Sequence, residues 1–125
     1  MNTIRRKIMS KGFEKIVASL ELCKLIPAGE FEDTALVWRY DRICGFICLM
    51  SGHPDETARL RNDGMIYPAP TAEEIMEKLD EPTLWRSDDG KCRCFCNGHV
   101  SAQKGGTIAD AALRLWLKVK GIELK

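Results

Sequence analysis

Residues 107–119 read TIADAALRLWLKV and form the clearest helical pattern in the chain. Thr107 is suited to cap this helix, with Asp110 at the capping-box position three residues later. Apolar residues fill most of the circumference, and charged residues spaced by four leave only a narrow polar stripe. Gly121 is placed to end the helix. We therefore expect a helix that is mostly buried, or that covers the domain and also meets a partner.

The rest of the chain predicts further helices and strands around this element. Helices are expected over residues 3–25 and 71–79, and a capping box of Thr71 and Glu74 opens the second. Strands are expected over residues 34–40, 43–50, 65–67, 83–86 and 91–96. The last two flank an Asp-Gly pair, which is a strong signal for a hairpin. The predicted fold class is α+β, with three helices packed on a small antiparallel sheet of about four strands.

Length and composition indicate one globular domain over residues 1–125. The chain is 45% hydrophobic and 30% charged, which excludes a disordered, collagen-like or low-complexity protein. Its net charge of +1 lacks the strong field that sequence-independent DNA binding uses. The charge is uneven, because residues 1–24 and 91–125 are basic while residues 70–90 are acidic.

The sequence predicts a cytoplasmic protein that does not enter a membrane. No apolar run approaches the 18 or more residues that a bilayer crossing requires. The basic cluster Arg5, Arg6 and Lys7 is not followed by the apolar segment of a secretory signal. In the cytoplasm the six cysteines are expected as free thiols or metal ligands rather than disulfides.

The cysteines are the first candidates for chemistry. Cys92, Cys94 and Cys96 alternate along one expected strand, so they share a face. The Cα atoms of residues i and i+4 in a strand, here Cys92 and Cys96, lie about 13 Å apart. That distance is too long for a disulfide, and also for a shared zinc ion, which needs the two sulfur atoms within about 4 Å of each other. We therefore interpret the three as small core residues. A cross-strand metal site stays open, and its candidate ligands are Cys44, Cys48, Cys94, Cys96 and His99.

Nucleic-acid contact is possible but not favoured by the sequence. The candidate contact residues are the basic side chains at the start of the first expected helix: Arg5, Arg6, Lys7, Lys11 and Lys15. Aromatic residues on strands could offer stacking surfaces, namely Trp38, Tyr40, Trp85 and Phe95. Because no known RNA-binding aromatic motif accompanies them, we interpret them first as core or cross-strand pairs.

No enzyme and no cofactor is predicted. His53 and His99 each lie in a glycine-containing stretch, and either could pair with a cysteine as a base with its nucleophile. The spacing selects no pair, and the Gly-x-Ser-x-Gly elbow is missing from the sequence. Residues 103–107, QKGGT, precede a helix but lack the glycine and lysine placement of a phosphate-binding loop.

Two segments carry a resemblance to known proteins. Residues 67–79 read YPAPTAEEIMEKL, and residues 107–118 read TIADAALRLWLK. With the expected hairpin between them, they resemble small uncharacterised proteins of phage and prophage gene clusters over roughly residues 65–122. That family has no assigned activity or catalytic residues to carry over, and the resemblance implies an accessory protein that binds a protein partner.

The leading hypothesis is therefore a non-enzymatic accessory protein acting through protein–protein interaction, with self-association possible. The alternative is a small metal- or nucleic-acid-binding module that uses the cysteine-rich hairpin and the basic N-terminal helix.

Overall fold

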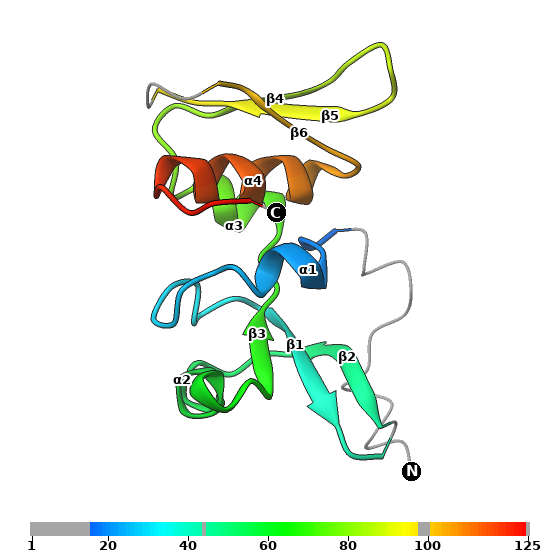
Figure 1. Cartoon of the computed structure of the whole chain (residues 1–125), viewed down its shortest axis with the longest axis vertical. Helices are drawn as coiled ribbons and strands as arrows, with labels where there is room; N and C mark the ends of the chain where they lie inside the picture. Colours follow the sequence, from blue (N-terminus) through cyan, green and yellow to red (C-terminus); the bar gives the residue numbers. More distant parts are fainter. Residues whose placement is uncertain (1–15, 44, 98–100, 125) are drawn as a thin grey trace.

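The described part of the chain contains two three-stranded sheets with helices between and around them. The computed structural model describes residues 16–43, 45–97 and 101–124 (Figure 1). Its strands are β1 (Leu36–Asp41), β2 (Phe46–Ser51), β3 (Ile66–Pro68), β4 (Thr83–Arg86), β5 (Cys92–Phe95) and β6 (Gln103–Gly105). Its helices are α1 (Leu20–Cys23), α2 (Pro54–Leu60), the 3-10 helix η2 (Arg61–Asp63), α3 (Ala72–Met76) and α4 (Ile108–Val119).

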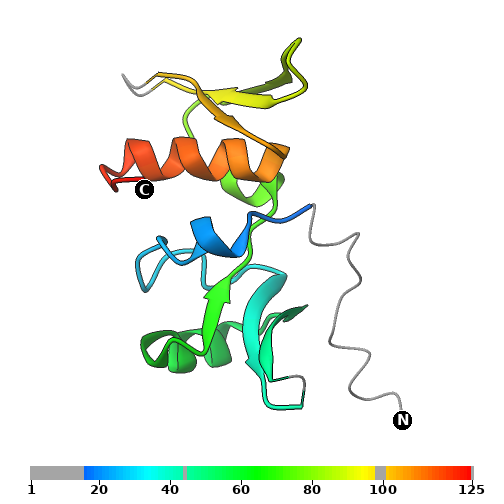
Figure 2. The ribbon, with the colours of Figure 1, turned by 45° about the vertical axis from the view of Figure 1, so that its right-hand side comes forward.

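The α+β class is confirmed, but the expected arrangement of three helices on one sheet of about four strands is wrong. The strands pair in the orders β2-β1-β3 and β4-β5-β6, and every pairing is antiparallel. Between the two sheets lie α4, α3 and α1, and α2 lies beyond the first sheet (Figures 1 and 2). The described residues therefore hold two small sheets on opposite sides of a helical layer.

Helix α4 is covered from two directions. Seven of its residues are buried, and it contacts β5 and β6 on one side and α3 on another. A helix that is apolar around most of its circumference must be covered from more than one direction. One sheet cannot do this, because it covers only one side of a helix. The second covering layer comes from α3 and from α1.

The helix ends form as the sequence predicts. The Thr71 hydroxyl accepts a hydrogen bond from the backbone N–H of Glu74 at 3.2 Å, and the Glu74 carboxylate accepts one from the N–H of Thr71 at 2.9 Å. At the end of α4, Gly121 has a φ of +79°, and Ile122 donates its N–H to the carbonyl of Leu117 at 2.8 Å. This is the Schellman ending expected of a glycine after a helix.

Over the residues that the structure describes, the expected first helix is confirmed only at Leu20–Cys23 and is wrong for residues 16–19. Residues 1–15 lie outside the described residues, and α1 begins only at Leu20. Val17 instead forms a β-bridge with Thr71, and Ala18 donates its N–H to the carbonyl of Pro70 at 2.9 Å. Both Val17 and Ala18 are buried in this extended segment. In a helix their backbone groups would bond within the helix and could not pair with residues 70–71.

The first sheet is covered on both faces around Val37 and Trp38, whereas Tyr40 and Phe46 at its far end are exposed. On one face Trp38 joins the main core, and its indole N–H donates to the carbonyl of Ala18 at 3.1 Å. On the other face Val37, Met50 and Ile66 form a smaller cluster against Leu60 of α2. Strand β2 begins at Phe46 rather than at residue 43. None of the helices in the described ranges is both long enough and apolar enough to cross a membrane.

Candidate functional site

The cysteines of β5 face the core. Cys92 and Cys94 lie on the side of β5 that packs on α4, and Cys96 follows them into the same cluster. All three are buried, which agrees with their interpretation as core residues. Burial raises the pKa of the Cys94 thiol to about 11, with a smaller contribution from the neighbouring Cys96. A thiol with such a pKa stays protonated at neutral pH and is a poor nucleophile.

Strand pairing does not bring Cys48 next to Cys94 or Cys96, as the expected metal site requires. Cys48 lies on β2 of the first sheet, whereas Cys94 and Cys96 belong to the second sheet and its core. Cys44 and His99 lie outside the described residues, so a site that includes them stays a prediction. Among the residues that the structure does describe, no group of three or more potential ligands is close enough to hold a metal ion.

The buried Cys94 thiol gives a prediction for the pH dependence of stability. In the unfolded chain the thiol loses its proton near pH 8.5, whereas in the folded chain it keeps the proton up to about pH 11. Between these values the unfolded state binds fewer protons, so the free energy of unfolding falls as the pH rises. Urea unfolding between pH 8 and pH 11 should show this fall, and it should be smaller in Cys94→Ala. Equal pH slopes in the two proteins would contradict the prediction.

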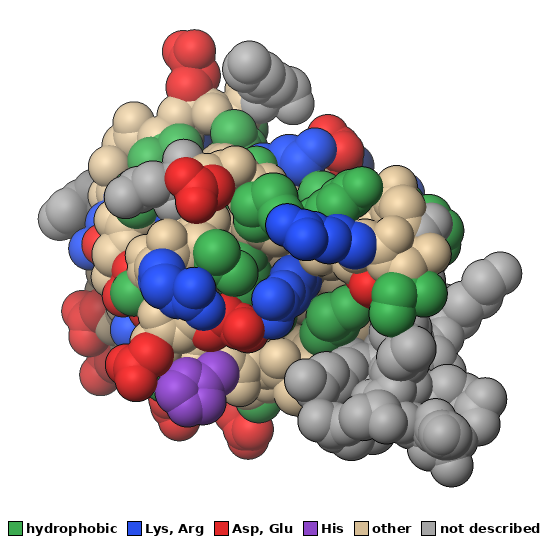
Figure 3. All heavy atoms as spheres, turned by 90° about the horizontal axis from the view of Figure 1, so that it is seen from below, with side chains coloured by type: hydrophobic (Ala, Val, Ile, Leu, Met, Phe, Trp, Pro, Cys, Tyr) green, Lys and Arg blue, Asp and Glu red, His purple; other side chains and the backbone are tan. Residues whose placement is uncertain are grey.

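His53 lies at a polar hollow of about 490 Å³ at the end of the first sheet. The hollow lies between the strand ends and α2, and Figure 3 shows this end of the molecule with histidine, acidic and basic side chains close together. Arg39 and Glu56, which line it, form an ion pair of 2.5 Å between the Nη1 and Oε1 atoms. None of the described residues that line the hollow is a cysteine. Among the residues that the structure describes, this hollow therefore gives His53 no thiol nucleophile.

A second surface is an apolar groove at the side of α3. It is a shallow, open depression of about 480 Å³ whose apolar lining comes from Ala72 and Met76 of α3, Leu84 of β4 and Ile108 of α4. We call it the α3 groove. Ile108 is 43% exposed although seven of the twelve residues of α4 are buried. Two carboxylates also line the groove, those of Glu73 and Glu77.

A third surface is the outer face of the β4-β5-β6 sheet. Trp85 and Phe95 are 41% and 43% exposed, so of the two expected roles, core residue or cross-strand pair, they take the second, whereas Trp38 is a buried core residue. Trp85 pairs with Arg93 across the strands, and Arg93 pairs with Lys104. An aromatic ring and two basic side chains thus form one row across three strands.

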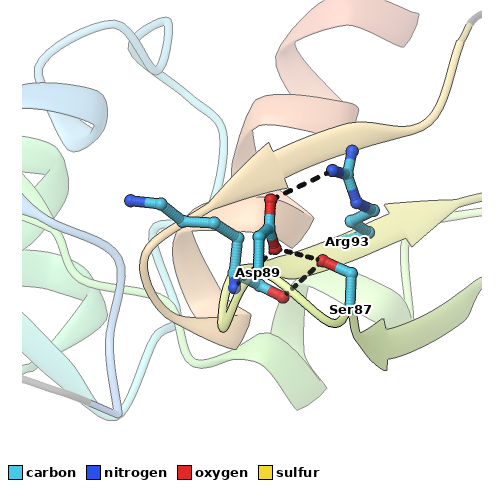
Figure 4. A network of polar contacts seen from close by, with 4 residues as sticks. Ser87, Asp89 and Arg93 are labelled. Atoms are coloured by element: carbon cyan, nitrogen blue, oxygen red, sulfur yellow. Dashed lines mark hydrogen bonds and ion pairs between the residues drawn. The ribbon is translucent and has the colours of Figure 1, made fainter.

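The turn between β4 and β5 is fixed by hydrogen bonds to Asp89. Its carboxylate accepts bonds from the Ser87 hydroxyl at 2.6 Å and from the backbone N–H of Lys91 at 3.0 Å (Figure 4). These two bonds lower the pKa of Asp89, with a smaller effect from Arg93. The Arg93 guanidinium lies 3.4 Å from the other carboxylate oxygen. The turn therefore holds the predicted antiparallel pairing of residues 83–86 with residues 92–95 in register.

Sequence reasoning missed the α3 groove because no local motif encodes it. Met76, Leu84 and Ile108 come from three elements, and each fits an ordinary apolar position of its own pattern.

The basic candidates Arg5, Arg6, Lys7, Lys11 and Lys15 lie outside the described residues. Comparison with protein-family models, with curated proteins and with solved structures gives no match in any of the three. Any functional conclusion therefore rests on the surfaces of this chain.

Proposed function

We propose that this chain is a non-enzymatic accessory protein of the phage or prophage type, which acts by binding a protein partner in the α3 groove. The observation that carries the proposal is an apolar lining flanked by two carboxylates. Met76, Leu84 and Ile108 leave apolar surface in contact with water, and covering such surface is favourable. The phage-type assignment extends the resemblance predicted from residues 65–122, and the comparisons with known proteins add no match to it.

The charges beside the groove select the chemistry of the partner. Glu73 and Glu77 lie four residues apart, and both are exposed. Neither forms an ion pair with any residue in the described ranges. Like charges at this spacing repel each other on a helix surface, and a basic partner would relieve that repulsion. The partner segment is therefore amphipathic, with apolar side chains flanked by Lys or Arg.

A pair of synthetic peptides tests the proposal. One peptide is an amphipathic helix with Leu on one face and Lys on its flanks, and the other has Glu in place of every Lys. We expect the Lys peptide to bind the full chain in fluorescence anisotropy and the Glu peptide not to bind. Equal binding of both peptides, or binding of neither, would remove the basis for the proposal.

Two serine substitutions on α4 provide the matched comparison. Ile108→Ser removes part of the apolar lining of the groove, whereas Val119→Ser changes a side chain of similar exposure, 40%, at the other end of the same helix. Ile108→Ser should weaken peptide binding roughly tenfold, and Val119→Ser should leave it unchanged. Equal effects of the two would show that the peptide does not use the groove.

A photoreactive side chain at position 76 tests for another occupant. With the Lys peptide present, the cross-link from the full chain should lie on the peptide. Cross-links that lie only on residues 1–15 of the same chain, or on a second copy, would show that the groove is already filled. Either result would overturn the proposal of an external partner.

A further inference from the structure

We propose that the outer face of the β4-β5-β6 sheet binds single-stranded nucleic acid, independently of the α3 groove. The face presents five outward side chains, which we call the sheet platform: Thr83, Trp85, Arg93, Phe95 and Lys104. Their common feature is that they alternate with the inward residues of the same strands. The platform combines two exposed aromatic rings with two basic side chains.

The register of the strands sets the spacing of the aromatic rings. Phe95 pairs with Thr83, and Trp85 pairs with Arg93, two residues away on β5. Trp85 and Phe95 are therefore diagonal neighbours on the same face of the sheet. The Cα atoms of such neighbours lie about 7–8 Å apart. At that distance each ring can accept a separate base. Stacking of bases on aromatic side chains suits all sequences, because every base has a π-face.

The charges of the platform favour a polyanion. Arg93 and Lys104 are direct cross-strand neighbours, and none of the five platform residues is acidic, so the Asp89 carboxylate of the adjoining turn offsets only one of the two positive charges. The ion pair of Arg93 with Asp89 is exposed and 3.4 Å long, so it holds the guanidinium weakly and a phosphate can compete for it. A second copy placed face to face would bring like charges together, which disfavours self-association through this face.

The opposite side of the sheet makes the platform rigid. Cys92 and Cys94 point inward from β5 and are fully buried against the core. The outward residues between and beside them therefore have a fixed backbone. A preformed surface loses little freedom when it binds, which favours affinity from a small number of contacts.

Intrinsic fluorescence gives a direct readout of stacking. Trp85 is exposed, whereas Trp38 and Trp116 are buried, so a quencher that acts by stacking reports on Trp85. The full chain is titrated with eight-nucleotide oligo(dT), eight-nucleotide oligo(rU) and a DNA duplex of the same length. We expect both single strands to quench the fluorescence and the duplex to bind more weakly. A preference between the two single strands identifies DNA or RNA as the ligand.

The salt dependence tests the basic side chains. Two phosphate contacts to a single strand predict a slope of about −1.4 for log K against log salt concentration. Lys104→Gln should weaken binding and make the slope less steep by about 0.7. A slope near zero would overturn the proposal, and so would competition by poly-glutamate as effective as that by the oligonucleotides. The second result would assign the face to acidic proteins.

Matched aromatic substitutions test the platform itself. Phe95→Ala should weaken oligonucleotide binding roughly 5- to 100-fold and leave Trp85 as the reporter. The control is Tyr40→Ala, which removes an aromatic ring of similar exposure, 37%, from the other sheet. Equal losses in the two variants would contradict the assignment. Ile108→Ser should not change oligonucleotide binding, which separates this proposal from that of the α3 groove.

Discussion

Replacing Trp116 by alanine is expected to lower the free energy of unfolding by about 3–5 kcal/mol. Trp116 lies near the middle of the helical layer on α4 and is only 1% exposed. Its ring meets the ring of Phe31 edge to face, with the ring centroids 4.8 Å apart. Since small domains are stable by about 5–15 kcal/mol, this single change removes a large share of the total.

The chain contains its own control for this substitution. Trp85→Ala removes the same side chain from the exposed face of the second sheet, and we expect a change within about 0.5 kcal/mol. Urea unfolding followed by far-ultraviolet circular dichroism measures both variants, because this signal does not depend on the tryptophan that is removed. Similar losses of stability in the two would show that α4 is not the centre of the core.

Local patterns predicted the local elements well. The N-caps at Thr71 and Thr107 and the glycine ending at Gly121 form as expected, because each depends on residues within a few positions of the helix end. The reciprocal bond of a capping box forms only at Thr71, because the Asp110 carboxylate instead accepts a hydrogen bond from the backbone N–H of the distant Ser19 at 2.7 Å. The antiparallel pairing of residues 83–86 with residues 92–95 also follows from a local signal, the turn around Gly90. Such interactions can be found in a sequence without knowledge of the tertiary structure.

Long-range contacts decide what the sequence did not show. The pairing of Val17 with Thr71 replaces helix by an extended segment, and the two residues are far apart in the sequence. Trp38 and Trp85 both lie on strands, yet one is buried and the other exposed. The difference arises because Trp38 lies where its face of the first sheet meets the main core, whereas Trp85 lies on the face of the second sheet that points away from α4. No local pattern reports how many faces of a sheet are covered.

Strand β6 shows the same limit at Gly105 and Gly106. In the sequence these two glycines look like a loop before a helix. In the structure Gly105 ends β6, and a Cβ atom on it would lie 2.5 Å from the backbone nitrogen of Ala111 and 2.9 Å from the carbonyl carbon of Asp110. Glycine is needed there because the strand passes directly against the first turn of α4.

Gly105→Ala is therefore expected to lower the free energy of unfolding by about 1–3 kcal/mol, because backbone atoms of α4 must move to admit the methyl group. Gly106→Ala is the matched control, since a Cβ atom on Gly106 meets nothing within 4 Å. Both substitutions restrict the unfolded chain to a similar extent, so the difference between them isolates the contact of β6 with α4. Urea unfolding of the two variants measures that difference. If Gly106→Ala is as destabilising as Gly105→Ala, β6 does not pack on α4 as described.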